Sequence, residues 1–334
     1  MKMKSLFSNV LSVITFTVLI SALCGGNELY ASSKRVYVTN AGNNTVSVID
    51  TSTNEIVMTV RVGVWPAGIA IDRVTDRAYI ANSNKGDNTI SVIDLKSNFT
   101  VATIKVGTGP MNTALNPSTK LAYVTNAEDA NQIVSIIDLT ENTVKGTIKV
   151  GVGPFDLAIS GNKLYVTNAG ENTVSVIDLA ENKILDIIKV AAIPLGITVN
   201  PANQRVYLAN HGDNSVTVID AANNKVIETV KVGNKPWDVA VDPDNKRLYV
   251  TNRYGDSVSV IDTASNKVVD TVKVGKEPIS LAVDPDNKRL YVVNHADVSV
   301  SIIDTASNKI IGTVKLTPST DSAYAGSPWG IAIH

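Results

Sequence analysis

Four short segments between residues 236 and 273 decide the fold: Pro236-Trp-Asp-Val-Ala-Val-Asp242, Arg247-Leu-Tyr-Val-Thr-Asn252, Ser257-Val-Ser-Val-Ile-Asp262 and Lys267-Val-Val-Asp-Thr-Val-Lys273. Each has the length of a β-strand and is rich in Val, Ile, Thr and Tyr, which strands favour. Turn-forming residues separate the segments, as in Asp242-Pro-Asp-Asn245. The stretch therefore predicts four consecutive strands.

The same unit recurs along the chain past residue 33. Five of the six steps between the tyrosines of the second segment are 42 residues and one is 44, at Tyr37, Tyr79, Tyr123, Tyr165, Tyr207, Tyr249 and Tyr291. A period of about 40–45 residues is typical of a four-stranded propeller blade. The apolar period of about 3.6 residues that helical repeats show is absent. We therefore expect an all-β protein, a β-propeller of four-stranded blades.

The two ends of the repeat region predict a closed ring. The first repeat starts at Arg35-Val-Tyr-Val-Thr-Asn40 and lacks a Pro-initiated first strand, whereas Ser327-Pro-Trp-Gly-Ile-Ala-Ile333 is such a strand with no others after it. One C-terminal strand and three N-terminal strands complete a seventh blade. We expect the last strand to pair beside Arg35–Asn40, closing a seven-bladed propeller over residues 32–334 and removing exposed sheet edges.

The second segments resemble the YVTN-repeat β-propeller family. The match is nearly literal at Tyr37-Val-Thr-Asn40, Tyr123-Val-Thr-Asn126, Tyr165-Val-Thr-Asn168 and Tyr249-Val-Thr-Asn252. The resemblance implies a propeller and an exported protein, because members of the family occur among exported bacterial and archaeal proteins, including archaeal surface-layer proteins. It implies no particular activity, since propellers host enzymes, scaffolds and binding modules alike.

The N-terminal segment predicts export. Lys2 and Lys4 precede an apolar run over Phe7–Leu23, and residues 1–31 are typical of a secretory signal peptide cut after Ala31. The alternatives are an uncleaved membrane anchor, because a span needs about 18 apolar residues, and lipid modification of Cys24. Cleavage after Ala31 leaves a mature chain with no cysteine and no membrane span. We expect a secreted, periplasmic or cell-surface protein.

Composition and missing motifs narrow the function. Lys and Arg number 30 and Asp and Glu 31, for a net charge of -1, which argues against nucleic acid as a partner. One Cys and three His exclude a disulfide scaffold and a cysteine-based zinc site. The sequence has no G-x-S-x-G, H-E-x-x-H or phosphate-loop motif. It therefore predicts no catalytic residue, metal ligand or cofactor.

Residues present in every repeat are expected to serve the blade. One Asn ends each second strand and one Asp each third strand, and both side chains can bond nearby backbone N–H groups. The asparagines are Asn40, Asn82, Asn126, Asn168, Asn210, Asn252 and Asn294. The aspartates are Asp50, Asp94, Asp138, Asp178, Asp220, Asp262 and Asp304. A proline opens each first strand.

Functional residues are expected where the repeat is broken. The positions beside the repeat prolines and the loops between second and third strands should share one face of the ring, and most departures fall there. The connection from Asp304 to Pro328 is 24 residues, against 16 in the other repeats. We expect a binding platform at the channel mouth made of Trp65, Met111, Phe155, Trp237, Asp238, Arg253, Tyr254, Tyr324 and Trp329.

Two functions remain open. The first is a non-enzymatic propeller that binds a protein or glycan partner at the cell surface, as a component of an envelope layer. The second is a periplasmic or extracellular enzyme at the channel mouth, a metal-assisted lactonase or lyase in which Asp156, Asp238 and Asn112 gather around a divalent ion. The aromatic residues could instead plug the channel. His211 and His295 are expected to be isolated, solvated imidazoles.

Overall fold

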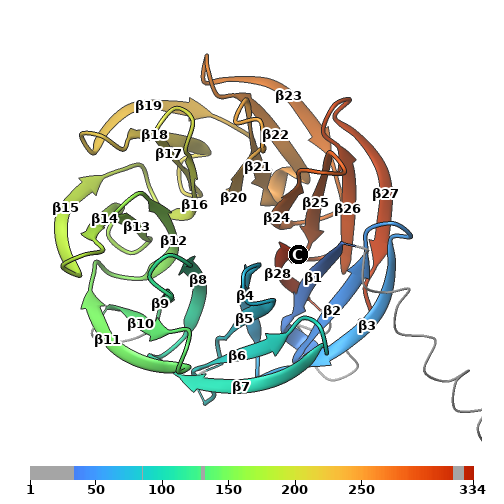
Figure 1. Ribbon diagram of the computed structural model, residues 1–334. Helices are drawn as coiled ribbons and strands as arrows, with labels where there is room; N and C mark the ends of the chain where they lie inside the picture. The colour runs from blue at the N-terminus through green and yellow to red at the C-terminus, as the bar shows by residue number, and fades with distance from the viewer. Residues whose placement is uncertain (1–33, 85, 129–131, 319–326) are drawn as a thin grey trace, which may run out of the picture.

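The computed structural model describes residues 34–84, 86–128, 132–318 and 327–334 as a ring of seven four-stranded antiparallel sheets (Figure 1). Within each sheet the strands are hydrogen-bonded in sequence order from the channel outward, apart from the closing sheet, whose order is β28-β1-β2-β3. The predicted all-β, seven-bladed propeller is confirmed.

The strands fall into four concentric sets. The innermost are β4 (Pro66–Asp72), β8 (Pro110–Asn116), β12 (Pro154–Ser160), β16 (Pro194–Asn200), β20 (Pro236–Val241), β24 (Pro278–Asp284) and β28 (Pro328–Ile333). The second are β1 (Arg35–Asn40), β5 (Arg77–Asn82), β9 (Leu121–Asn126), β13 (Lys163–Asn168), β17 (Arg205–Asn210), β21 (Arg247–Asn252) and β25 (Arg289–Asn294). The third are β2 (Thr45–Asp50), β6 (Thr89–Asp94), β10 (Ile133–Asp138), β14 (Thr173–Asp178), β18 (Ser215–Asp220), β22 (Ser257–Asp262) and β26 (Ser299–Asp304). The outermost are β3 (Glu55–Arg61), β7 (Phe99–Lys105), β11 (Thr143–Lys149), β15 (Lys183–Lys189), β19 (Lys225–Lys231), β23 (Lys267–Lys273) and β27 (Lys309–Lys315). Two short 3-10 helices, η1 (Ala41–Asn43) and η2 (Arg253–Gly255), follow second strands.

The ring closes as the sequence predicts. Strand β28 pairs antiparallel with β1, with Tyr37 opposite Ala332 and Val38 opposite Ile331. The backbone N–H of His334 donates to the carbonyl of Arg35 at 2.9 Å, which extends the pairing beyond the end of β28. Residues at the two ends of the described chain therefore share one blade.

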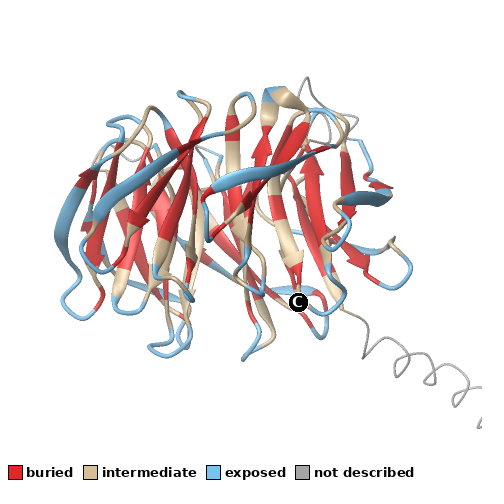
Figure 2. Ribbon diagram, turned by 90° about the horizontal axis from the view of Figure 1, so that it is seen from above, coloured by how far each residue is buried: buried red, intermediate tan, exposed pale blue. Residues whose placement is uncertain are grey.

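The hydrophobic core lies between blades rather than within them. Tyr37, for example, packs with Val46 and Val48 of its own blade and with Ile80 and Ile93 of the next. Second and third strands are buried nearly throughout, whereas outermost strands are largely exposed (Figure 2). Burial on both faces explains why the polar residues interleaved in the buried strands are mostly small Ser and Thr rather than charged side chains.

The threonine of the repeated motif connects successive innermost strands. The Oγ1 of Thr251 accepts a hydrogen bond from the N–H of Asp238 in its own blade at 2.9 Å. It also donates to the carbonyl of Ile279 in the next blade at 3.1 Å. One buried hydroxyl thus bonds two adjacent innermost strands at once, so this residue fixes the spacing between adjacent blades at the channel wall.

The repeated Asp and Asn have different partners. Asp262 accepts from the backbone N–H of Ser265 at 2.8 Å, which is the turn contact the sequence predicts. Asn252 instead donates from Nδ2 to the hydroxyls of Ser257 and Ser259 on β22. The expectation that the asparagines bond backbone N–H groups is wrong, because hydroxyl-bearing residues on the third strand lie opposite them and need a donor.

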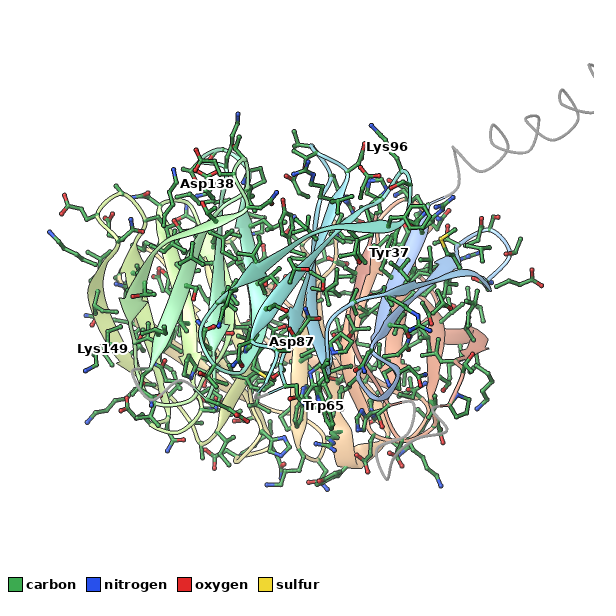
Figure 3. The ribbon with its side chains drawn as sticks, turned by 90° about the horizontal axis from the view of Figure 1, so that it is seen from below. Tyr37, Trp65, Asp87, Lys96, Asp138 and Lys149 are labelled. Atoms are coloured by element: carbon green, nitrogen blue, oxygen red, sulfur yellow. The ribbon has the colours of Figure 1, made fainter. Side chains whose placement is uncertain are left out.

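The connections into the innermost strands and the loops after the second strands lie at the same end of the ring. The N–H of Ser83, which follows β5, donates to the carbonyl of Trp65, which precedes β4, at 2.8 Å. Figure 3 shows Trp65 and Asp87 toward this end, and Lys96 and Asp138 toward the opposite one. We call the end that carries Trp65 the mouth of the channel.

Candidate binding site at the mouth of the channel

An aromatic cluster occupies the mouth, formed by Phe155, His211, Trp237, Tyr254, His295 and Trp329. The ring of Trp237 is its centre, with ring centroids 5.8 Å from Phe155 and 5.9 Å from Trp329. Both contacts are edge-to-face, at 81° and 83°, the geometry that aromatic quadrupoles prefer. Residues that follow three repeat prolines far apart in the sequence are thus in mutual contact.

A cation lies over this cluster. The guanidinium carbon of Arg253 is 4.8 Å from the ring centroid of Trp237 and 5.3 Å from that of Tyr254, within the range of a cation–π interaction. The Nη2 of Arg253 is also 2.8 Å from Oε2 of Glu277. The ion pair fixes the guanidinium group in position and offsets its charge.

The two loop histidines belong to the cluster. His211 packs edge-to-face on Trp237 at 5.4 Å, and His295 packs the same way on Trp329 at 5.5 Å. The Nδ1 atom of each faces a proline carbonyl, at 3.2 Å for His211 and 3.0 Å for His295. Burial lowers the pKa of both imidazoles. The expectation of isolated, solvated imidazoles is therefore wrong.

The other predicted site residues differ in their surroundings. The hydroxyl of Ser83 donates to the sulfur of Met111 at 3.4 Å, and its N–H bonds the carbonyl of Trp65, so Trp65 and Met111 both contact one loop residue. Tyr254 is exposed. Tyr324 lies outside the described residues.

A pocket of about 180 Å³ lies on the axis, lined by residues of all seven innermost strands. Phe155, Trp237 and Trp329 form part of its wall. Asp156 and Asp238 line it beside them. On β12 and β20, the residue that follows the aromatic one, Asp156 or Asp238, therefore makes the pocket wall acidic.

The two carboxyl groups are held by backbone N–H groups. Asp156 accepts from the N–H of Leu157 at 2.8 Å and from that of Ile197, in the next blade, at 2.9 Å. Asp238 accepts from the N–H of Val239 at 2.8 Å and from the hydroxyl of Ser280 at 3.1 Å. Burial raises the pKa of both carboxyl groups, and the charge of Asp238 further raises that of Asp156.

Asn112 lies in the same pocket, so the three residues that the sequence offers as a metal site do share one cavity. Within the described ranges, no group of three or more His, Cys, Asp or Glu side chains could hold a metal ion. In the same part of the chain, no helix is long and apolar enough to cross a membrane.

Sequence reasoning missed the participation of His211, His295 and Glu277. A signal exists: His211, Arg253 and His295 occupy one position, the first after the second strand, in three successive blades. Only the ring geometry shows that this position faces the residue after the repeat proline. Glu277 precedes a repeat proline, and its role depends on the placement of Arg253.

The fold and this site define a class, the seven-bladed propellers with a ligand-sized axial pocket. Within that class, the chain belongs to the YNCE-like beta-propeller family, whose model matches residues 20–283. No curated protein matches the chain.

Solved structures share the fold at low sequence identity. A functionally unknown protein from Desulfotomaculum acetoxidans has a TM-score of 0.75 at 18% identity, covering 90% of this chain and 99% of that one. A putative 6-phosphogluconolactonase from Bacteroides fragilis has 0.74 at 17%, covering 91% and 99%. Kuenenia stuttgartiensis hydrazine synthase has 0.73 at 21%, covering 81% and 92%. The likeness extends to the fold alone.

Proposed function

We propose that this protein is an exported propeller that binds a protein or glycan partner at the cell surface through the mouth of its channel. The aromatic cluster centred on Trp237 is the observation that carries the proposal. Large rings with a paired arginine on one face are typical of binding hot spots. Aromatic faces also stack on the apolar faces of sugars, so the same surface suits a glycan.

Export rests on the N-terminal segment, in which Lys2 and Lys4 precede the apolar run Phe7–Leu23. Expression of the full chain in a bacterial host tests it. We expect the protein outside the cytoplasm, with an N-terminus at Ser32 by Edman sequencing. A cytoplasmic protein that still begins at Met1 would contradict export and leave the binding proposal to its own test.

A glycan array and a peptide array test binding. We expect a signal on one of them that falls by about tenfold or more in Trp237→Ala and Trp329→Ala, because hot-spot truncations cost about 2 kcal/mol or more. Phe99→Ala is the matched control, since Phe99 is an exposed aromatic on outer strand β7. Equal binding by Trp237→Ala and the native protein, both folded by circular dichroism, would contradict the proposal.

A lactonase-like enzyme is the second candidate. The observation that favours it is the presence of Asp156, Asp238 and Asn112 in one axial pocket, the arrangement proposed for metal-assisted hydrolysis. The structural likeness to the putative 6-phosphogluconolactonase suggests a sugar lactone as the first substrate to try. Lactone hydrolysis that requires a stoichiometric divalent ion and is lost in Asp238→Ala would replace the non-enzymatic proposal.

A further inference from the structure

The axial pocket has a one-sided charge. Among the described residues that line it, Asp156 and Asp238 are the charged side chains, and both are acidic. Arg253, the cation that lies over the aromatic cluster, does not line the pocket and is paired with Glu277. Two half-buried carboxyl groups without a cationic partner in the pocket wall are costly when ionised, so a positively charged occupant would relieve that cost.

The carboxyl oxygens retain acceptor capacity. An ionised carboxylate has about four lone-pair sites. Asp156 uses one on each oxygen, for the N–H groups of Leu157 and Ile197. These bonds fix the orientation of the carboxylate and leave sites for a donor that enters the pocket.

A further polar group in the same wall lacks a partner. The buried hydroxyl of Thr113 makes no hydrogen bond within the described part of the chain, and Thr113 lines the pocket. A buried unpaired hydroxyl costs free energy unless a ligand or water bonds to it. It is independent of the carboxyl pair and can accept a hydrogen bond from an ammonium group.

The rest of the wall suits an organic cation rather than a bare ion. The rings of Phe155, Trp237 and Trp329 line the pocket, and aromatic faces attract ammonium and guanidinium groups. The pocket measures about 180 Å³, where one water needs only about 10–15 Å³. A short alkyl chain with a cationic head therefore fits.

We propose that the axial pocket binds a small organic cation, a primary ammonium or guanidinium group on a short alkyl chain, between the carboxyl groups of Asp156 and Asp238 and the rings of Phe155, Trp237 and Trp329. The group could belong to a free amine or to a Lys or Arg side chain of a peptide. The site shares Phe155, Trp237 and Trp329 with the aromatic cluster of the proposed function, but it is tested with small cations, separately from the array experiments.

Isothermal titration calorimetry with butylammonium, butylguanidinium and neutral butanol tests this inference. We expect both cations to bind at about pH 8, and butanol to bind more weakly by about tenfold or more, since a hydrogen bond to a charged group contributes about 1.5–3 kcal/mol. Spermidine, and a short peptide that carries one unmodified lysine and an acetylated N-terminus, then distinguish a free amine from a side chain. Failure of both butyl cations to bind, or equal binding of butanol, would overturn the proposal.

Variants locate the site. Asp156→Asn and Asp238→Asn should each weaken butylammonium binding by about tenfold or more. Asp213→Asn is the matched control, because exposed Asp213 also accepts a backbone N–H, that of Ala192, at the mouth. Unchanged affinity in both pocket variants, folded by circular dichroism, would overturn the assignment.

A measurement on the native protein keeps the test independent of variant folding. Burial favours the neutral carboxyl groups, so a cation that binds between them must drive protons off. Titration at about pH 7 in two buffers of different ionisation enthalpy measures this release. We expect protons to be released with butylammonium and none with butanol. Cation binding without proton release would place the ligand elsewhere.

Discussion

The backbone adopts a left-handed conformation, which most side chains avoid, just before most of the repeat prolines. The residue before each of six repeat prolines has a positive φ: Trp65, Gly109, Gly153, Ile193, Lys235 and Glu277. A side-chain oxygen 21 residues earlier accepts the N–H of each, from Asn44, Asn88, Gln132, Asn172, Asn214 and Asp256. These acceptors have positive φ themselves, which Asn tolerates better than β-branched residues do.

Asn214→Val should lower the free energy of unfolding by about 2–3 kcal/mol. It removes the bond to the N–H of Lys235, 2.8 Å long, and places a β-branched residue at φ 51°. Asn214→Gly removes the bond without the strain, so we expect a smaller loss of about 1–2 kcal/mol. Urea unfolding followed by circular dichroism measures both. Equal losses in the two variants would show that a β-branched residue at this positive φ adds no strain.

The strands as elements were largely predictable from the sequence. The predicted segment Lys267–Lys273 is strand β23, and Pro236–Asp242 differs from β20 by one residue. The repeat made this possible, because seven copies of one pattern give the same strand limits. The contact of Trp237 with Phe155 could not be predicted, since it joins residues 82 positions apart across the mouth. It depends on the ring diameter, which no local pattern encodes.

Carboxyl groups link neighbouring innermost strands. Asp156 on β12 accepts from Ile197 on β16, and Asp238 on β20 accepts from Ser280 on β24. The sequence offered both residues as ligands without any sign of these bonds, because their partners, the N–H of Ile197 and the hydroxyl of Ser280, lie on the innermost strand of the next blade. Burial, which raises both pKa values, is likewise a property of the assembled channel.

Asp156→Asn should flatten the dependence of stability on pH. A carboxyl group whose pKa is raised on folding binds more protons in the native state, so it contributes its stability below the unfolded pKa of about 3.9. That contribution is lost as the pH rises through the folded pKa. The native protein should therefore lose stability, relative to the variant, from about pH 5 to about pH 8.

Urea midpoints at the two pH values measure this effect, and the difference between the two proteins cancels the contribution of groups that do not interact with Asp156. The lowered pKa of His211 and His295, for instance, is common to both. Asp213→Asn serves again as the control and should track the native protein, since Asp213 is exposed. Parallel curves for the native protein and Asp156→Asn would show that Asp156 does not titrate with a raised pKa.

The ring as a whole is closed by the pairing of β28 with β1. Arg289 on β25 donates to the carbonyl of Thr51 in the closing blade at 2.6 Å. Arg205 on β17 makes the same contact with Thr263 at 2.9 Å, between two blades that are consecutive in the sequence. The interface with the closing blade therefore has the same contact as an interface between consecutive blades. The closing blade differs from the others in one respect. Its innermost strand, β28, does not precede β1 in the sequence and joins the blade by pairing with it.

Deletion of residues 328–334 should destabilise the entire ring. It removes the partner of β1 and exposes the core around Ile331 and Ile333, which are 7% and 6% exposed. Burial of each such side chain contributes about 1.5–3 kcal/mol, so the loss is a large fraction of a total stability of about 5–15 kcal/mol. We expect the thermal midpoint by calorimetry to fall steeply, or the cooperative transition to vanish. His334→Ala, which breaks only a partly exposed contact with Asp76, should cost less than about 1 kcal/mol. A truncated protein that melts with the native one would show that six blades and three strands are stable without closure.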